Sequence, residues 1–207
     1  TSNLSLNAID TTTPSALAIT TADATSNNLS QTISGTGEVG STITVYDGAT
    51  VVGTAVVNAN GNWATAVTLS GQGQHTLTAT STDAAGNTTA STANGTATSQ
   101  DVVITIDTTA PVVNLVRVAD GQNSLYDSGF TATTSATVTI TVDGVALTGS
   151  ALANAFTISA PANGVVTYTA NAGAFTGGEV IVVSASETDT AGNVGTSNLS
   201  LNAIDTT

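Results

Sequence analysis

The eight residues STITVYDG at positions 41–48 alternate between polar and apolar side chains. In an extended strand this alternation places Ile43 and Val45 on one face and the threonines on the other. The stretch ends in an Asp-Gly pair, which is the strongest short signal for a tight β-hairpin. It therefore predicts a half-buried strand followed by a hairpin turn.

The same pattern returns at positions 137–144 as TVTITVDG. Other alternating or apolar runs, separated by clusters of turn residues, lie at 74–82, 102–106, 112–118, 165–169 and 180–184. Helical periodicity is limited to one possible turn at 149–156, GSALANAF. Many short strands between turn signals predict an all-β fold.

Landmarks of the first half of the chain recur in the second half. AIDTTTP at 8–14 returns as TIDTTAP at 105–111, and TDAAGN at 82–87 returns as TDTAGN at 188–193. The repeat is about a hundred residues long, which is the usual size of an immunoglobulin-like sandwich. The sequence therefore predicts two tandem immunoglobulin-like β-sandwich domains joined end to end.

The predicted boundaries follow from these landmarks, with domain 1 at 10–106 and domain 2 at 107–207. The first twelve residues, TSNLSLNAIDTT, are identical to residues 196–207, which close the second copy. We therefore expect residues 1–9 to be an orphan, the last strand of a preceding repeat.

The amino-acid composition excludes several classes of function. The 207 residues include 14 acidic side chains and a single Lys or Arg, so the net charge is −13. Such a chain repels nucleic acid and anionic lipid. The chain has no cysteine, which excludes disulfides and thiolate metal sites. No apolar run approaches the roughly 18 residues of a membrane span, so we expect no membrane insertion.

Several motifs in order resemble a known family. The stretch SGTGEVGSTITVYDG at 34–48, followed by ANGNW at 59–63 and TDAAGN, resembles the bacterial Ig-like repeats of large biofilm-associated surface adhesins. IDTTAP at 106–111 is similar to the linker between such repeats. The second copy keeps the linker, the Asp-Gly turn and the AGN turn but lacks GTGEVG and the tryptophan. The resemblance implies an extracellular stalk on the bacterial cell surface, often with calcium at its joints.

Strand geometry leads to the same sites. A sandwich with an odd number of strands has its two chain ends at opposite poles, which places the linker beside particular loops. At the central joint this predicts that Asp107 lies near Asp189, with Asp23 approaching from the first domain. At the front, Asp10, Glu38 and Asp83 are expected to gather. Crowded carboxylates and the absence of thiols select Ca²⁺ as the metal at these six residues.

A simpler interpretation stays open for each acidic residue. Asp, Asn and Gly are common turn residues, and an Asp that opens an Asx-turn explains DAAGN equally well. Asp47 and Asp143 are expected to serve only their hairpins.

We expect a structural extender, or stalk, of a surface adhesin, which contacts neighbouring repeats of the same chain. Its distal parts can reach another cell or surface. The alternative is an Ig-like module that binds a glycan or another surface through its loops, for which only a few aromatic residues are available. An enzyme is not expected. GTGEVG matches a dinucleotide fingerprint but precedes a strand. His75 is expected on an exposed strand face, and Trp63 is expected in the core.

Overall fold

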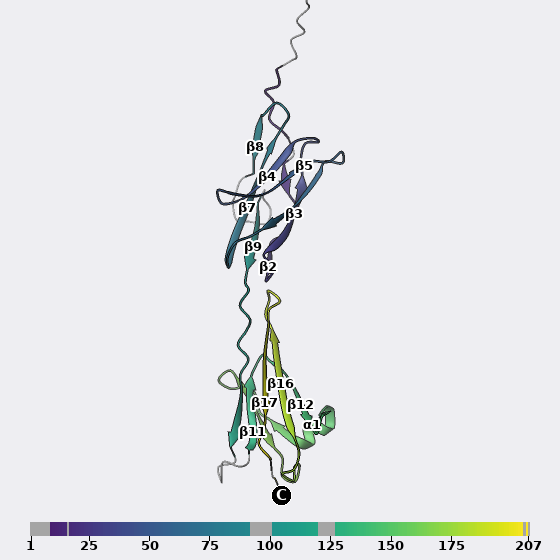
Figure 1. Ribbon diagram of the computed structural model, residues 1–207, viewed down its shortest axis with the longest axis vertical. Helices are drawn as coiled ribbons and strands as arrows, with labels where there is room; N and C mark the ends of the chain where they lie inside the picture. Colours follow the sequence, from purple (N-terminus) through teal and green to yellow (C-terminus); the bar gives the residue numbers. More distant parts are fainter. Residues whose placement is uncertain (1–8, 16, 92–100, 120–126, 205, 207) are drawn as a thin grey trace, which may run out of the picture. The chain divides into compact units, whose positions relative to one another are not determined.

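The computed structural model describes residues 9–15, 17–91, 101–119, 127–204 and 206 (Figure 1). The chain divides into two compact units, Thr1–Thr108 and Thr109–Thr207. The residues of the predicted orphan strand, apart from Ile9, lie outside the described part.

The first unit is built from strands. Their bounds are β1 Ala18–Ile19, β2 Ala24–Ser26, β3 Ser30–Thr36, β4 Thr42–Asp47, β5 Thr50–Val56, β6 Asn62–Thr68, β7 Gly73–Thr82, β8 Thr88–Ala90 and β9 Val102–Ile106. The described strands form one sheet in the order β1-β3-β6 and a second in the order β2-β9-β7-β4-β5, with β8 paired to β7. Two sheets face each other over one core, so the immunoglobulin-like sandwich is confirmed.

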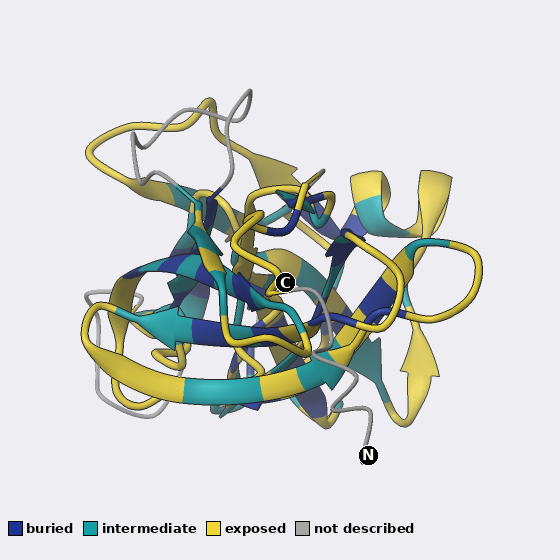
Figure 2. Cartoon of the chain, turned by 90° about the horizontal axis from the view of Figure 1, so that it is seen from above, coloured by how far each residue is buried: buried dark blue, intermediate teal, exposed yellow. Residues whose placement is uncertain are grey.

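Alternation along the strands builds this core, as buried and exposed colours alternate along the ribbons (Figure 2). Ile43 and Val45 of β4 are fully buried, as the sequence predicted. Ile33 and Trp63 face them from the other sheet, and the Trp63 indole N–H donates to the carbonyl oxygen of Thr36 at 3.0 Å. The prediction that Trp63 fills the core is therefore confirmed.

One pairing among the described strands of the first unit is parallel, whereas immunoglobulin-like sandwiches are built from antiparallel sheets. Strand β1 pairs with β3 in one sheet, and after residues 20–23 the chain crosses to pair as β2 with β9 in the other sheet. Strand β2 lies near the beginning of the unit and β9 at its end. The long connection between them allows the two strands to pair in parallel, which a tight hairpin would not. The sequence signal missed this strand because β2 has only three residues, ATS.

The second unit is a sandwich of two four-stranded sheets whose strands differ in length. Its elements are β10 Leu115–Ala119, β11 Asp127–Thr133, β12 Thr137–Val142, β13 Val145–Ala146, α1 Gly149–Ala155, β14 Phe156–Ile158, β15 Val165–Ala170, β16 Ile181–Thr188 and β17 Val194–Ser200. The described strands form sheets in the orders β10-β11-β15-β14 and β13-β12-β16-β17. The one predicted turn of helix is confirmed as α1.

Aromatic side chains fill the core of the second unit. Phe130 stacks on Tyr168 with ring centroids 4.5 Å apart, and Phe156 meets Phe130 edge-on at 6.0 Å. Ile140 and Val183 cover them from the facing sheet. Both predicted Asp-Gly hairpins also form, because β4 pairs with β5 and β12 pairs with β13.

Candidate functional site at the linkers

The two AGN turns have the same geometry. Asp83 Oδ1 accepts the backbone N–H groups of Ala85 and Asn87 at 2.9 Å each, and Asp83 Oδ2 accepts the Asn87 side-chain amide at 2.8 Å. Asp189 makes the equivalent three bonds, at 2.9, 2.9 and 2.8 Å, with Ala191 and Asn193. The side-chain amide is the main cause that holds the pKa of each carboxyl below its ordinary value. These aspartates therefore build their own turns.

In the first unit, the incoming linker lies against this turn. The Asn87 side-chain amide donates to the backbone carbonyl of Asp10 at 3.2 Å, and the Thr89 hydroxyl donates to the carbonyl of Pro14 at 2.6 Å. Glu38 accepts the backbone N–H of Ser15 at 3.0 Å. The segment Asp10–Ser15 is thus held from two separate loops, those of Asn87 and Glu38.

Asp10, Glu38 and Asp83 all contribute to this region, but each carboxylate has its own backbone donor. Asp10 Oδ1 accepts the N–H of Thr12 at 2.9 Å. No group of three or more His, Cys, Asp or Glu side chains that could hold a metal ion exists within the described ranges. The structure therefore brings the backbone of Asp10 to the Asp83 turn without collecting three carboxylates.

Asp23 and Asp107 are separated within the first unit. Asp23 Oδ1 accepts the N–H of Val103 at 2.8 Å, at the start of the β2–β9 pairing. Asp107 lies past the other end of that pairing, where its N–H donates to the carbonyl of Ser26 at 3.0 Å. Val103 and Asp107 are four positions apart along the chain, about 13 Å at the usual rise of a strand. The structure does not bring these two aspartates together, because Asp23 precedes strand β2 and Asp107 follows the other end of the β2–β9 pairing.

Asp189 belongs to the second unit. There the close neighbour of the linker is Gly195, two residues after Asn193. A Cβ atom built on Gly195 would collide with the carbonyl oxygen of Pro111. The backbone of the linker proline therefore passes directly over this strand.

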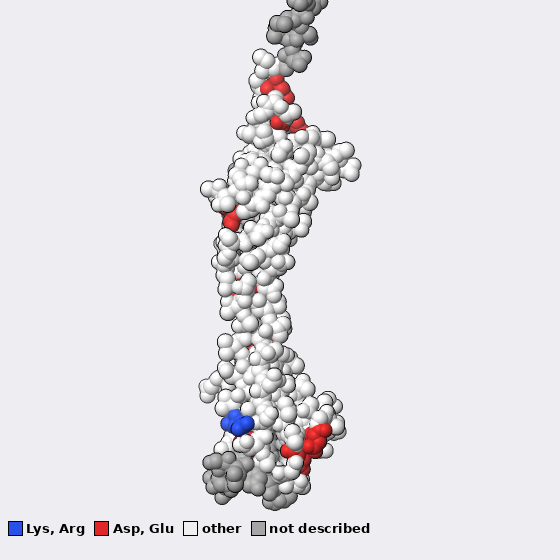
Figure 3. Space-filling view, in the orientation of Figure 1, with Lys and Arg blue, Asp and Glu red and all other residues white. Residues whose placement is uncertain are grey.

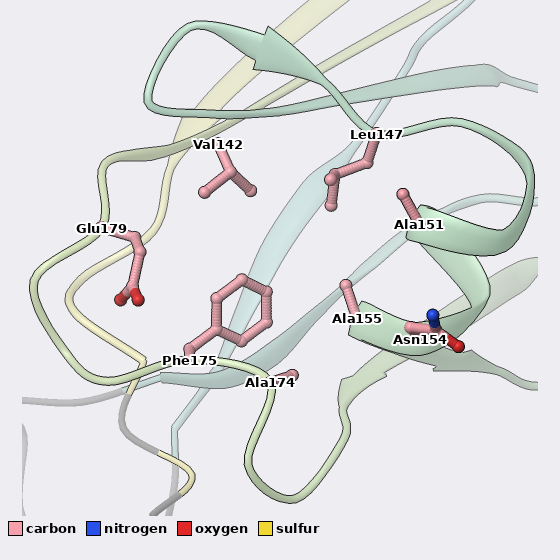
Figure 4. A pocket seen from close by; sticks show the side chains of 8 residues that line it. All are labelled: Val142, Leu147, Ala151, Asn154, Ala155, Ala174, Phe175 and Glu179. Atoms are coloured by element: carbon pink, nitrogen blue, oxygen red, sulfur yellow. The ribbon is translucent and has the colours of Figure 1, made fainter.

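The second unit also contains an open pocket of about 320 Å³ beside α1 (Figure 4). Its walls are mostly apolar, with Val142, Leu147 and Phe175 among the lining side chains and Glu179 at one side. Glu179 accepts the N–H groups of Thr176, Gly177 and Gly178 and the Thr176 hydroxyl, and that hydroxyl is the main cause that lowers its pKa. The charge of Glu179 is thus committed to its own loop, and among the described lining residues Asn154 is the one other polar side chain.

Two residues differ from the sequence-based expectation. His75 is buried, not exposed, and its Nδ1 lies 2.6 Å from Asp47 Oδ2. Asp47 therefore pairs with an imidazole in addition to ending its strand, whereas Asp143 accepts the N–H of Val180. The signal that was available is the position of His75 in the apolar alternation with Leu77 and Ala79 along β7.

The surface is poor in charge. Figure 3 shows most of the visible atoms as neither acidic nor basic, with few acidic positions and one basic side chain. That side chain is Arg117, whose guanidinium donates to the carbonyl of Ser200 at 2.6 Å and lies 3.7 Å from the buried carboxylate of Asp127. The single basic side chain of the sequence is thus engaged within its own unit.

The chain is similar to known bacterial proteins. Residues 12–101 match the family described as a bacterial Ig domain. The comparison with curated proteins gives no match. Among solved structures, the chain is 21% identical to a Ca²⁺-stabilised adhesin with which an Antarctic bacterium reaches out and binds ice. That match covers 93% of this chain and 48% of the other, at a TM-score of 0.47.

Two further solved structures are similar. Fibronectin(III)-like modules of CbhA from Clostridium thermocellum are 17% identical, with 94% of each chain covered and a TM-score of 0.37. The BSP domain of a biofilm-associated protein is 19% identical, with 92% of this chain and 30% of that chain covered and a TM-score of 0.29. This chain thus spans about half, or less, of the two adhesion proteins, and likenesses this distant say nothing about what it binds.

No helix in the described part of the chain is long and apolar enough to cross a membrane.

The family match coincides with the first sandwich, and the repeated landmarks relate the second sandwich to the first. The resemblance predicted from the sequence is therefore confirmed for the first sandwich, where residues 12–101 match the bacterial Ig domain family.

Proposed function

We propose that the chain is part of the extender of a bacterial surface adhesin, where it spaces other parts of the protein away from the cell. The observation that carries this proposal is the repetition of one sandwich design, with its linker and AGN turn, along a single chain. Strands of seven to ten residues predict that each unit adds about 30–40 Å, loops included. The function is spacing and not chemistry.

The burial of aromatic side chains supports the extender over the glycan-binding module. Trp63 is buried at 3% exposure, so it cannot stack on a sugar ring. Among the described aromatic residues of the second unit, Phe130 packs on Tyr168 and Phe156 packs on Phe175 within the core. A glycan array separates the two candidates. The extender role predicts no specific binding, and saturable binding to one glycan would favour the ligand-binding module.

Calcium at the linkers is the finer part of the proposal. Fourteen acidic side chains and one cation leave counter-charge to come from solution. The Asn87 amide donates to both Asp83 Oδ2 and the Asp10 carbonyl, so these two oxygens lie on either side of one amide nitrogen. Oxygen donors of this kind suit Ca²⁺. We propose Asp10, Glu38 and Asp83 at the front, and Asp107 and Asp189 at the central linker, as the residues that would hold it.

The fit is partial within the described residues. Asp83 and Asp189 each use three of about four acceptor positions for their own turns. A calcium ion would therefore need backbone carbonyls or water as further ligands. When bound, the ion would supply positive charge that relieves repulsion between linker and turn.

Thermal melting with calcium and with a chelator tests this part. Calcium at ten times its dissociation constant stabilises a site by about 1.4 kcal/mol, so the wild-type melting temperature should rise. Asp107→Asn should lose part of that rise. Asp143→Asn is the matched control, because it removes the same charge at a hairpin whose bond to Val180 an asparagine can keep. An identical melting temperature in calcium and chelator would remove calcium and leave the extender role standing.

A further inference from the structure

In each unit the carbonyl of the linker proline lies at the residue two positions after the AGN turn. In the first unit the residue two positions after the AGN turn, Thr89, donates its hydroxyl to the carbonyl of Pro14. In the second unit the residue at that position, Gly195, has no side chain, and the carbonyl of Pro111 takes up the space of the missing Cβ. Both linker prolines therefore lie against the strand that follows the turn.

The contacts in the first unit are direct and do not involve a metal. Pro14 is buried, and the Thr89 bond to its carbonyl is short at 2.6 Å. Asn87 holds the carbonyl of Asp10, and Glu38 holds the N–H of Ser15. Three side chains, from the Asn87 turn, the Glu38 loop and strand β8, thus bind backbone groups at the beginning and the end of a six-residue segment.

We propose that each unit holds its own incoming linker without a metal ion, with Thr89, Asn87 and Glu38 as the positioning residues of the first unit. The linker then moves with the unit that follows it. This inference rests on the proposed extender role for its biological meaning, since a linker fixed to one neighbour leaves fewer bonds about which a stalk can bend.

The chain offers matched pairs of variants. Thr89→Val removes the hydroxyl and keeps the branched shape, and Thr88→Val makes the same change on the exposed neighbour. Glu38→Ala removes the acceptor of the Ser15 N–H, whereas Glu38→Gln removes the charge but keeps an acceptor oxygen.

The experiment is ¹⁵N relaxation and amide exchange on the full chain in the presence of a chelator. Wild type should show an ordered segment at Asp10–Ser15. Thr89→Val should lower its order parameters while Thr88→Val does not. Glu38→Ala should speed exchange of the Ser15 amide by about fivefold to tenfold, the worth of one hydrogen bond, and Glu38→Gln should not. Retained protection of the Ala85 and Asn87 amides shows that the turn itself is intact.

The proposal is overturned if Thr89→Val and Glu38→Ala leave the segment as ordered as in wild type. It is also overturned if the chelator alone disorders the segment in wild type. An ordered segment in chelator with no calcium effect on melting would remove the calcium site and keep this clamp. A calcium-dependent melting temperature, with a segment that stays ordered in both variants, would keep the calcium site and remove the clamp.

Discussion

At the scale of single residues, the acidic side chains act first as turn builders. Asp83 and Asp189 each receive two backbone N–H groups and one amide from within their own five-residue turn. The sequence left two interpretations of these aspartates open, a metal ligand and an Asx-turn. The hydrogen bonds realise the second interpretation, and calcium at the same place remains a proposal.

This hydrogen bonding predicts an acid-sensitive turn. The pKa of Asp83 in the folded chain lies below its ordinary value of 3.8, chiefly because of the Asn87 amide. A depressed pKa stabilises the fold fully above the unfolded value, and the contribution is lost as pH falls through the folded pKa. We therefore expect the Ala85 and Asn87 amides to lose exchange protection as pH falls below about 3.8.

Asp83→Asn provides the comparison for that titration. An asparagine keeps an acceptor oxygen but cannot ionise, so its turn should be weaker at neutral pH and insensitive to acid in this range. Acid-induced loss of protection that is equal in wild type and in Asp83→Asn would assign the effect to other groups.

At the scale of elements, strong alternation predicted strands well and short elements poorly. The alternating or apolar runs that became β4, β7, β9, β12 and β15 were located from the sequence, because each strand has at least five residues, enough for the pattern to show. Strands β1, β2, β13 and β14 have two or three residues, too few to show a period. They exist because neighbouring strands supply their hydrogen bonds.

Two residues near the candidate site were also placed wrongly from the sequence. Asp23 was expected near Asp107 at the central joint, and the pairing of β2 with β9 places it beside Val103 instead. His75 was expected on the surface, yet the core side of β7 includes position 75, and the His75 ring reaches the carboxylate of Asp47. Both errors arise from tertiary pairing, which a local pattern does not contain.

Gly195 gives a prediction at this scale. Gly195→Ala should displace the Pro111 backbone and destabilise the second unit by about 1–3 kcal/mol, the usual cost of overpacking. Gly178→Ala is the control, because a Cβ there has no neighbour within 4 Å. Urea unfolding measures both free energies. Equal stability of the two variants would mean that the linker does not lie against β17 as described.

At the scale of the whole molecule, each unit has its own core. The first is built around Ile33, Ile43 and Trp63, and the second around Phe130, Phe156 and Phe175. The two-domain organisation was visible in the repeated landmarks because repeats encode the same design twice. The sequence could not supply the packing that distinguishes them, such as the aromatic core and α1 of the second unit.

Separate cores predict two separable melting transitions. Trp63→Ala should cost about 3–5 kcal/mol and lower the first unit's melting temperature by at least about 12 °C. Phe130→Ala should do the same to the second unit only. Calorimetry follows both transitions, and Trp63 fluorescence reports the first in wild type because it is the sole tryptophan. A shift of both transitions by either variant would contradict independent units.

The most direct test of a calcium-stiffened extender is the distance between the two units in solution. The chain has no cysteine, so Ala49→Cys and Ala160→Cys, both on exposed loops, allow one spin label in each unit. Double electron–electron resonance should give a single narrow distance distribution in calcium and a broader one in chelator. Distributions of equal width in the two conditions would contradict the account.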